Sequence, residues 1–97
     1  LDQKYTPKRI MEHALINLKQ SDVFIALNYG IVGEGMGVEF GYAHNMSMPI
    51  LVLLLKQTKS ISFRALCDLV IEFDNIEEIK KPINEFLLDI THQQKSC

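Results

Sequence analysis

Between two apolar runs, at residues 23–27 and 49–55, the chain reads Gly33-Glu34-Gly35-Met36-Gly37-Val38-Glu39-Phe40-Gly41-Tyr42-Ala43. Short, continuous apolar runs of this kind are typical of parallel strands that are covered on both faces. The glycines between them therefore indicate a strand-to-helix turn inside a βαβ unit. In open α/β sheets, ligands bind outside the carboxyl ends of the strands, where such turns lie.

The rest of the chain alternates helical and strand patterns. In chain order, the spacing of apolar residues predicts a helix at 7–20, a helix at 35–47, a short helix at 61–66, a strand at 69–73 and a helix at 76–90. Pro82 should bend the last helix or split it in two, and the polar residues 91–97 should form a frayed tail. This order predicts an α/β fold of three layers, α/β/α, around a parallel sheet.

The length of 97 residues corresponds to a single domain. Three parallel strands alone would leave residues 23–27 at an unpaired edge, and this run is too apolar for an edge strand. We therefore expect at least one further strand beside it, supplied by upstream residues, by a partner chain, or lost by truncation. The start at Leu1, without an initiating methionine, favours upstream residues and an N-terminally incomplete domain.

Composition and charge exclude several classes of partner. The net charge is −2 and the charges form no block of one sign, so we expect no nucleic-acid partner. The longest apolar run falls far short of the roughly 20 residues of a membrane span, and no signal peptide opens the chain, which predicts a cytoplasmic protein without a membrane partner. We expect no metal and no cofactor, because CxxC, HxH and HxxxH spacings are missing among Cys67, Cys97, His13, His44 and His92.

The glycine turn is the candidate site. Gly35 and Gly37 would let backbone amides face a polar or anionic ligand at a helix N-terminus. We expect Glu39 in the first turn of that helix, held ionised by the helix dipole, which suits a nucleophile better than a general acid. Gly37 and Gly41 should bring the helix backbone close to the sheet and leave Glu39 facing the crevice. A first-turn glutamate that the dipole favours and that has no function is the alternative.

These segments resemble a known family. Ser21-Asp22-Val23-Phe24-Ile25-Ala26-Leu27, the run from Gly35 to Ala43, and Pro49-Ile50-Leu51-Val52-Leu53 are similar to the nucleoside 2-deoxyribosyltransferase superfamily, which includes the 2′-deoxynucleoside 5′-phosphate N-hydrolases. The resemblance implies a flavodoxin-like (Rossmann-like) sheet, of which this chain would be the C-terminal part, lacking the first strands. It also implies that Glu39 is the nucleophile that takes the deoxyribosyl group from the base.

The resemblance implies further site residues and one departure. Gly35, Gly37 and Glu34 would contact substrate near the turn, and Ser62 loosely matches a serine that reaches the phosphate bound by a neighbouring subunit. For Glu34, an ordinary solvated loop charge is the alternative. The family places a base-contacting aspartate eight residues before the position of Asp22, where this chain has Ala14.

The resulting hypothesis is an enzyme, a nucleoside 2-deoxyribosyltransferase or deoxynucleoside monophosphate N-glycosidase. It would cleave or transfer the N-glycosidic bond of deoxynucleosides or their 5′-monophosphates through a glycosyl-Glu39 intermediate. Its partner would be a small nucleoside or nucleotide, and the chain would form a homo-oligomer, a dimer or higher. The alternative is a non-catalytic nucleotide-binding or assembly module on the same fold.

Overall fold

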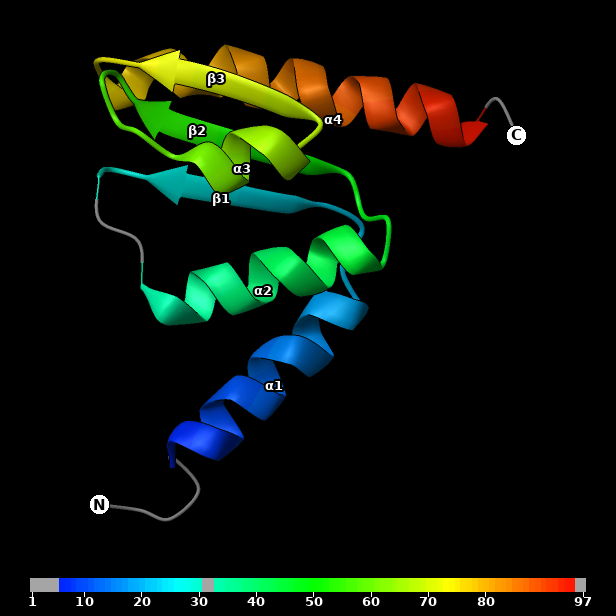
Figure 1. Ribbon diagram of the computed structural model, residues 1–97. Coiled ribbons are helices and arrows are strands. Elements are labelled where there is room, and N and C mark those ends of the chain that lie inside the picture. Colours follow the sequence, from blue (N-terminus) through cyan, green and yellow to red (C-terminus); the bar gives the residue numbers. More distant parts are fainter. Residues whose placement is uncertain (1–5, 31–32, 96–97) are drawn as a thin grey trace.

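The computed structural model of the chain describes residues 6–30 and 33–95, and for residues 92–95 it describes the backbone alone. The three strands form one open parallel sheet in the order β1-β2-β3, which confirms the predicted α/β fold class. The elements, in chain order, are α1 (Pro7–Lys19), β1 (Phe24–Asn28), α2 (Glu34–Asn45), β2 (Ile50–Leu55), α3 (Ile61–Leu66), β3 (Leu69–Phe73), the 3-10 helix η2 (Ile76–Ile79) and α4 (Lys80–Lys95) (Figure 1).

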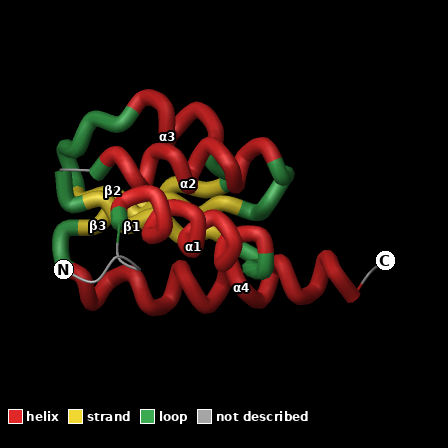
Figure 2. Tube along the Cα trace, turned by 90° about the horizontal axis from the view of Figure 1, so that it is seen from below, coloured by secondary structure: helices red, strands yellow, loops and turns green. Residues whose placement is uncertain are grey.

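The central strand β2 builds the core, because alternate side chains of a strand point to opposite faces of the sheet. Ile50, Val52 and Leu54 pack with residues of α2 and α3 on one face. Leu51 and Leu53 pack with residues of α4 on the other face. Figure 2 shows the resulting layers, with α4 on one side of the sheet and α2 and α3 on the opposite side.

Strand β1 lies at one edge of the sheet. Its register with β2 pairs Ala26 with Val52, and Ala26 is buried, whereas Ile25 is 37% exposed. No further strand lies beside β1 among residues 6–30 and 33–95. The additional strand expected from the apolar composition of this edge therefore stays a prediction.

Helix α1 packs on α2 and covers little of the sheet (Figure 1). Thr6 begins it as an N-cap whose side chain accepts a hydrogen bond from the Arg9 amide, and Pro7 is its first residue. Leu18, near its carboxyl end, is buried in the core, whereas Ile10 and Ile16 are both 52% exposed. Helix α1 therefore contacts the rest of the domain in two ways: it packs on α2, and Leu18 in its last turn reaches the core.

The final helical segment is split, as the proline suggested, but the break precedes Pro82. Asn75 begins η2 with a capping box that includes Glu78, and α4 starts at Lys80. Pro82 thus lies in the first turn of α4, where a missing backbone N–H group is tolerated. Helix α4 includes residues 91–95, part of the segment expected as a tail; fraying of that end stays a prediction, and residues 96–97 lie outside the described residues.

Candidate functional site

Helix α2 begins one residue earlier than the sequence pattern suggested, and Glu39 lies beyond its first turn. Gly33 is the N-cap, with extended backbone at φ −72° and ψ 156°, and Glu34 is the first helical residue. Glu39 is therefore the sixth residue of the helix, beyond the first turn. The expectation that Glu39 lies in the first turn, within which the dipole effect falls off, is therefore wrong. Glu34 is the carboxylate of the first turn.

The glycine pair of α2 also faces away from the sheet. Phe40 and Ala43 are the residues of α2 that are buried in the core, so the side of the helix that carries them packs on the sheet. A methyl group added at Gly37 or Gly41 would meet no atom of the described residues within 4 Å. The expectation that these glycines bring the helix close to the sheet is therefore wrong.

Glu39 lies half-buried in a pocket of about 350 Å³ between α1, α2 and the amino-terminal end of β1. The expectation that Glu39 faces a crevice at the carboxyl end of this strand is therefore wrong. Helix α1 and the turn after it form one wall of the pocket, with both polar and apolar side chains. Phe24 and Ile25 of β1 form another wall. The lining residues are Ala14, Asn17, Leu18, Ser21, Val23, Phe24, Ile25 and Glu39. The structure thus brings together Ala14 and Glu39, the two positions that the resemblance assigned to base contact and to the nucleophile.

Two polar residues of this pocket were missed in the sequence. Asn17 follows Ala14 by three residues on α1, so the two share a helix face. Ser21 lies just after α1, and its hydroxyl donates to the backbone oxygen of Asn17 at 2.9 Å. The i,i+3 relation to Ala14 is the signal that would have identified Asn17 once Ala14 was placed in the site.

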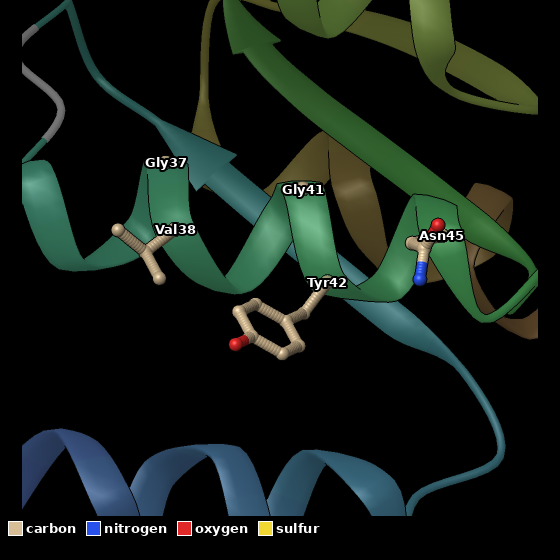
Figure 3. A pocket seen from close by; sticks show the side chains of 5 residues that line it. All are labelled: Gly37, Val38, Gly41, Tyr42 and Asn45. Atoms are coloured by element: carbon tan, nitrogen blue, oxygen red, sulfur yellow. The ribbon is translucent and has the colours of Figure 1, made fainter.

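The other candidate residues lie apart from this pocket. Glu34 is exposed at the start of α2, and Ser62 is exposed as the second residue of α3; within the described chain neither lines the Glu39 pocket. A methyl group on Gly35 would lie 3.7 Å from the Met11 sulfur of α1. Gly37 lines a different hollow on the open face of α2 (Figure 3). Substrate contacts by these four residues stay predictions.

The turn that leaves β1 is held by contacts of Asn28 and Tyr29. Asn28 is buried, and its side-chain oxygen accepts a hydrogen bond from the Gly30 amide at 2.7 Å. Gly30 has φ 116°, a conformation that glycine adopts without strain. Tyr29 packs edge-to-face on Phe73 of β3, with ring centroids 5.9 Å apart. These contacts fix the direction of the chain at the carboxyl edge of the sheet, between β1 and α2.

Over residues 6–30 and 33–95, no three or more His, Cys, Asp and Glu side chains gather closely enough to hold a metal ion. In the same part of the chain, no helix combines the length and the apolar character that crossing a membrane requires.

Comparison with solved structures identifies a protein of similar fold. The structure of the Clostridium botulinum CMP N-glycosidase BcmB superposes with a TM-score of 0.71 at 22% sequence identity, over 88% of this chain and 75% of that one. No protein-family model matches the chain, and no curated protein sequence matches it. At this identity the similarity establishes the fold.

Proposed function

We propose that the chain cleaves or transfers the N-glycosidic bond of a nucleoside or nucleoside 5′-monophosphate, with Glu39 as the nucleophile. The observation that carries this proposal is the half-buried Glu39 carboxylate in a pocket that it shares with Ala14 and Asn17. The similar fold of a CMP N-glycosidase supports the reaction class. The reaction requires no metal or cofactor, because the carboxylate and water supply all of its chemistry.

In the proposed reaction a Glu39 carboxylate oxygen attacks the anomeric carbon of the sugar as the bond from that carbon to the base nitrogen breaks. The bonding electron pair leaves with the base, which takes a proton from water. Water, or the N–H nitrogen of a second base, then attacks the glycosyl ester, gives up a proton to the hydroxide left by the first step, and restores the carboxylate. Leu18, Phe24 and Ile25 supply the apolar part of the pocket wall, against which the sugar or the base would pack.

The polar groups around Glu39 have distinct proposed roles. Asn17 and Ser21 face the same pocket as Glu39 and would hydrogen-bond the base or a sugar hydroxyl. Gly35 and Gly37 near the start of α2, with Glu34, would contact the sugar or phosphate, and Ser62 would reach the phosphate in a neighbouring subunit, as the family resemblance implies. A deoxyribose substrate is the form that the resemblance favours.

The test is release of free base from dCMP, CMP and deoxycytidine, followed by chromatography. Glu39→Gln keeps the shape of the side chain and removes the nucleophile, so we expect base release to fall by at least about 10³-fold. Glu85→Gln makes the same change on α4, on the opposite side of the sheet, and should leave the rate unaltered. Equal rates for wild type and Glu39→Gln would refute the proposal.

A non-catalytic nucleotide-binding module is the second candidate. Ala14 favours it, because a methyl group in the Glu39 pocket supplies no proton to a departing base. Titration calorimetry with dCMP, combined with chromatography of the same sample after several hours, separates the two. Heat of binding without any free base would support the module, and base release would support the enzyme.

A further inference from the structure

We propose that the substrate of the Glu39 pocket is an N-glycoside whose base carries a fixed positive charge on the ring that holds the glycosidic nitrogen. Pyridinium nucleotides and N7-alkylated purine nucleotides share this chemistry. The proposal rests on the proposed function, since it takes Glu39 as the nucleophile, and it adds the chemical class of the base. Its evidence is the set of side chains that line the pocket in the described part of the chain.

The described lining offers no group that protonates a departing base. Asn17 is a neutral amide, and the Ser21 hydroxyl already donates to the backbone oxygen of Asn17 at 2.9 Å. Apart from these two residues and Glu39, the described lining is apolar. A neutral base leaves as an anion unless it takes up a proton, and a positioned general acid contributes typically 10²- to 10⁴-fold to that step. A base with a fixed positive charge leaves as a neutral molecule and needs no acid.

Glu39 also has no counter-ion within residues 6–30 and 33–95. The ion pairs of these residues join other side chains, and none of their side-chain hydrogen bonds reaches the Glu39 carboxylate. The side chain is nevertheless half-buried. A carboxylate that is partly removed from water is stabilised by a nearby positive charge, and a cationic base in the pocket would supply that charge.

The wall from β1 suits a flat aromatic cation. The Phe24 ring is half-buried and packs edge-to-face on Phe40, with ring centroids 6.1 Å apart, which holds the Phe24 ring in place. Aromatic rings attract cations that lie against their faces. The pocket volume of about 350 Å³ is within the range of small-molecule sites. An aromatic wall beside a carboxylate therefore favours a positively charged ring over a neutral one.

The reaction balances without a proton donor. A Glu39 carboxylate oxygen forms a bond to the anomeric carbon while the bond from that carbon to the ring nitrogen breaks. The bonding electron pair stays on the nitrogen and cancels the positive charge of the ring, so the base departs neutral. Water then attacks the glycosyl ester, its proton passes to the solvent, and the carboxylate is restored.

The kinetic test uses the full chain and two matched pairs of nucleotides. Nicotinamide mononucleotide and its reduced form differ in the charge of the pyridine ring, and 7-methylguanosine 5′-monophosphate and GMP differ in the charge of the purine. Base release is followed by chromatography, and each kcat/KM is divided by the rate of spontaneous release to correct for the lability of the bond. We expect the charged member of one pair to exceed its neutral match by about 100-fold or more, because it loses nothing from the missing acid. The pair that shows this difference identifies the ring.

Binding provides a readout that does not depend on turnover. The carbocyclic analogue of nicotinamide mononucleotide keeps the charged ring and resists cleavage, so its dissociation constant can be measured by titration calorimetry. Glu39→Gln should weaken binding of this analogue at least about 10-fold and binding of its reduced form no more than about twofold, because a neutral amide forms weaker bonds to a charged group. Glu85→Gln, on the opposite side of the sheet, should bind both forms as the wild type does.

The possible failures are distinguishable. Equal corrected rates within both pairs, or an equal loss of binding of both carbocyclic forms in Glu39→Gln, would overturn the cationic substrate. If base release from dCMP still depends on Glu39 in that case, the proposed function stands and the substrate class alone is wrong. If no nucleotide, charged or neutral, releases its base in a Glu39-dependent manner, both proposals are wrong.

Discussion

Ala14 of α1 and Glu39 of α2 line the same pocket beside strand β1. One position carries a carboxylate and the other a methyl group, so Glu39 is the one acidic residue among those that line the pocket in the described part of the chain. The contact between α1 and α2 produces this arrangement. Under the proposed function, the side chains at these two positions decide whether the chain cleaves a bound nucleotide or only binds it.

Restoring a carboxyl group at position 14 should accelerate base release. In the proposed reaction the departing base needs a proton, and a positioned general acid contributes typically 10²- to 10⁴-fold. We expect Ala14→Asp to raise kcat for dCMP by roughly 10-fold or more, with a rate that falls as pH rises and the new carboxyl group ionises. Ala14→Asn has nearly the same shape and no transferable proton. An Asp variant no faster than the Asn variant would contradict this role.

Asn17 should contribute to substrate binding. Loss of one neutral hydrogen bond costs about 0.5–1.5 kcal/mol, so Asn17→Ala should lower kcat/KM about 2- to 10-fold. Asn17 is exposed outside any tight packing, and the melting temperature should change little. Asn84→Ala, on the exposed side of α4, is the matched control and should keep the wild-type kcat/KM. Identical kinetics for the two variants would exclude Asn17 from the site.

The core of the sheet should depend most on β2. Leu53 is 2% exposed and packs among residues of β3 and α4, so Leu53→Ala should lower the free energy of unfolding by about 2–5 kcal/mol. Leu88→Ala removes the same atoms from a side chain that is 59% exposed, and should cost less than about 1 kcal/mol. Urea unfolding followed by circular dichroism measures both. Similar losses for the two variants would contradict the packing described for β2.

The thiol of Cys67 should react slowly. Burial raises the pKa of Cys67 above its ordinary value of 9.0, and the thiolate is the reactive form. In a Cys97→Ser background, alkylation by iodoacetamide at pH 8 should therefore be slower in the folded chain than in urea. The pKa is higher in the folded state than in the unfolded state, so folding stability should decrease as pH rises above 9.0. Equal alkylation rates in the two states would contradict this.

The elements of the fold were largely readable from the sequence, because buried parallel strands are continuous apolar runs. The runs at residues 23–27, 49–55 and 69–73 each gave a strand within one residue of its observed bounds. The start of α2 was misplaced because Gly33 is an N-cap without a side chain, so no Ser, Thr, Asp or Asn marked it. The difference is one residue, and Glu39 lies beyond the first turn with either start.

The site was only partly readable, because side-chain direction depends on which face of a helix packs. The glycine spacing suggested a close approach of α2 to the sheet, but burial of Phe40 and Ala43 turned Gly37 and Gly41 outward. The pairing of position 14 with Glu39 came from the family resemblance, and the structure places both in one pocket. Asn17 and Ser21 join them only because α1 packs on α2, a tertiary contact that periodicity does not reveal.

The most direct measurement is trapping of the glycosyl-enzyme. A 2′-deoxy-2′-fluoroarabino analogue of dCMP slows release of the intermediate, because fluorine destabilises the cation-like transition state. Intact mass spectrometry should show the chain heavier by the mass of the fluorinated sugar phosphate, and peptide mapping should place the addition on Glu39. Glu39→Gln should remain unlabelled. An addition on another residue, or base release by the wild type while no addition forms, would contradict Glu39 as the nucleophile.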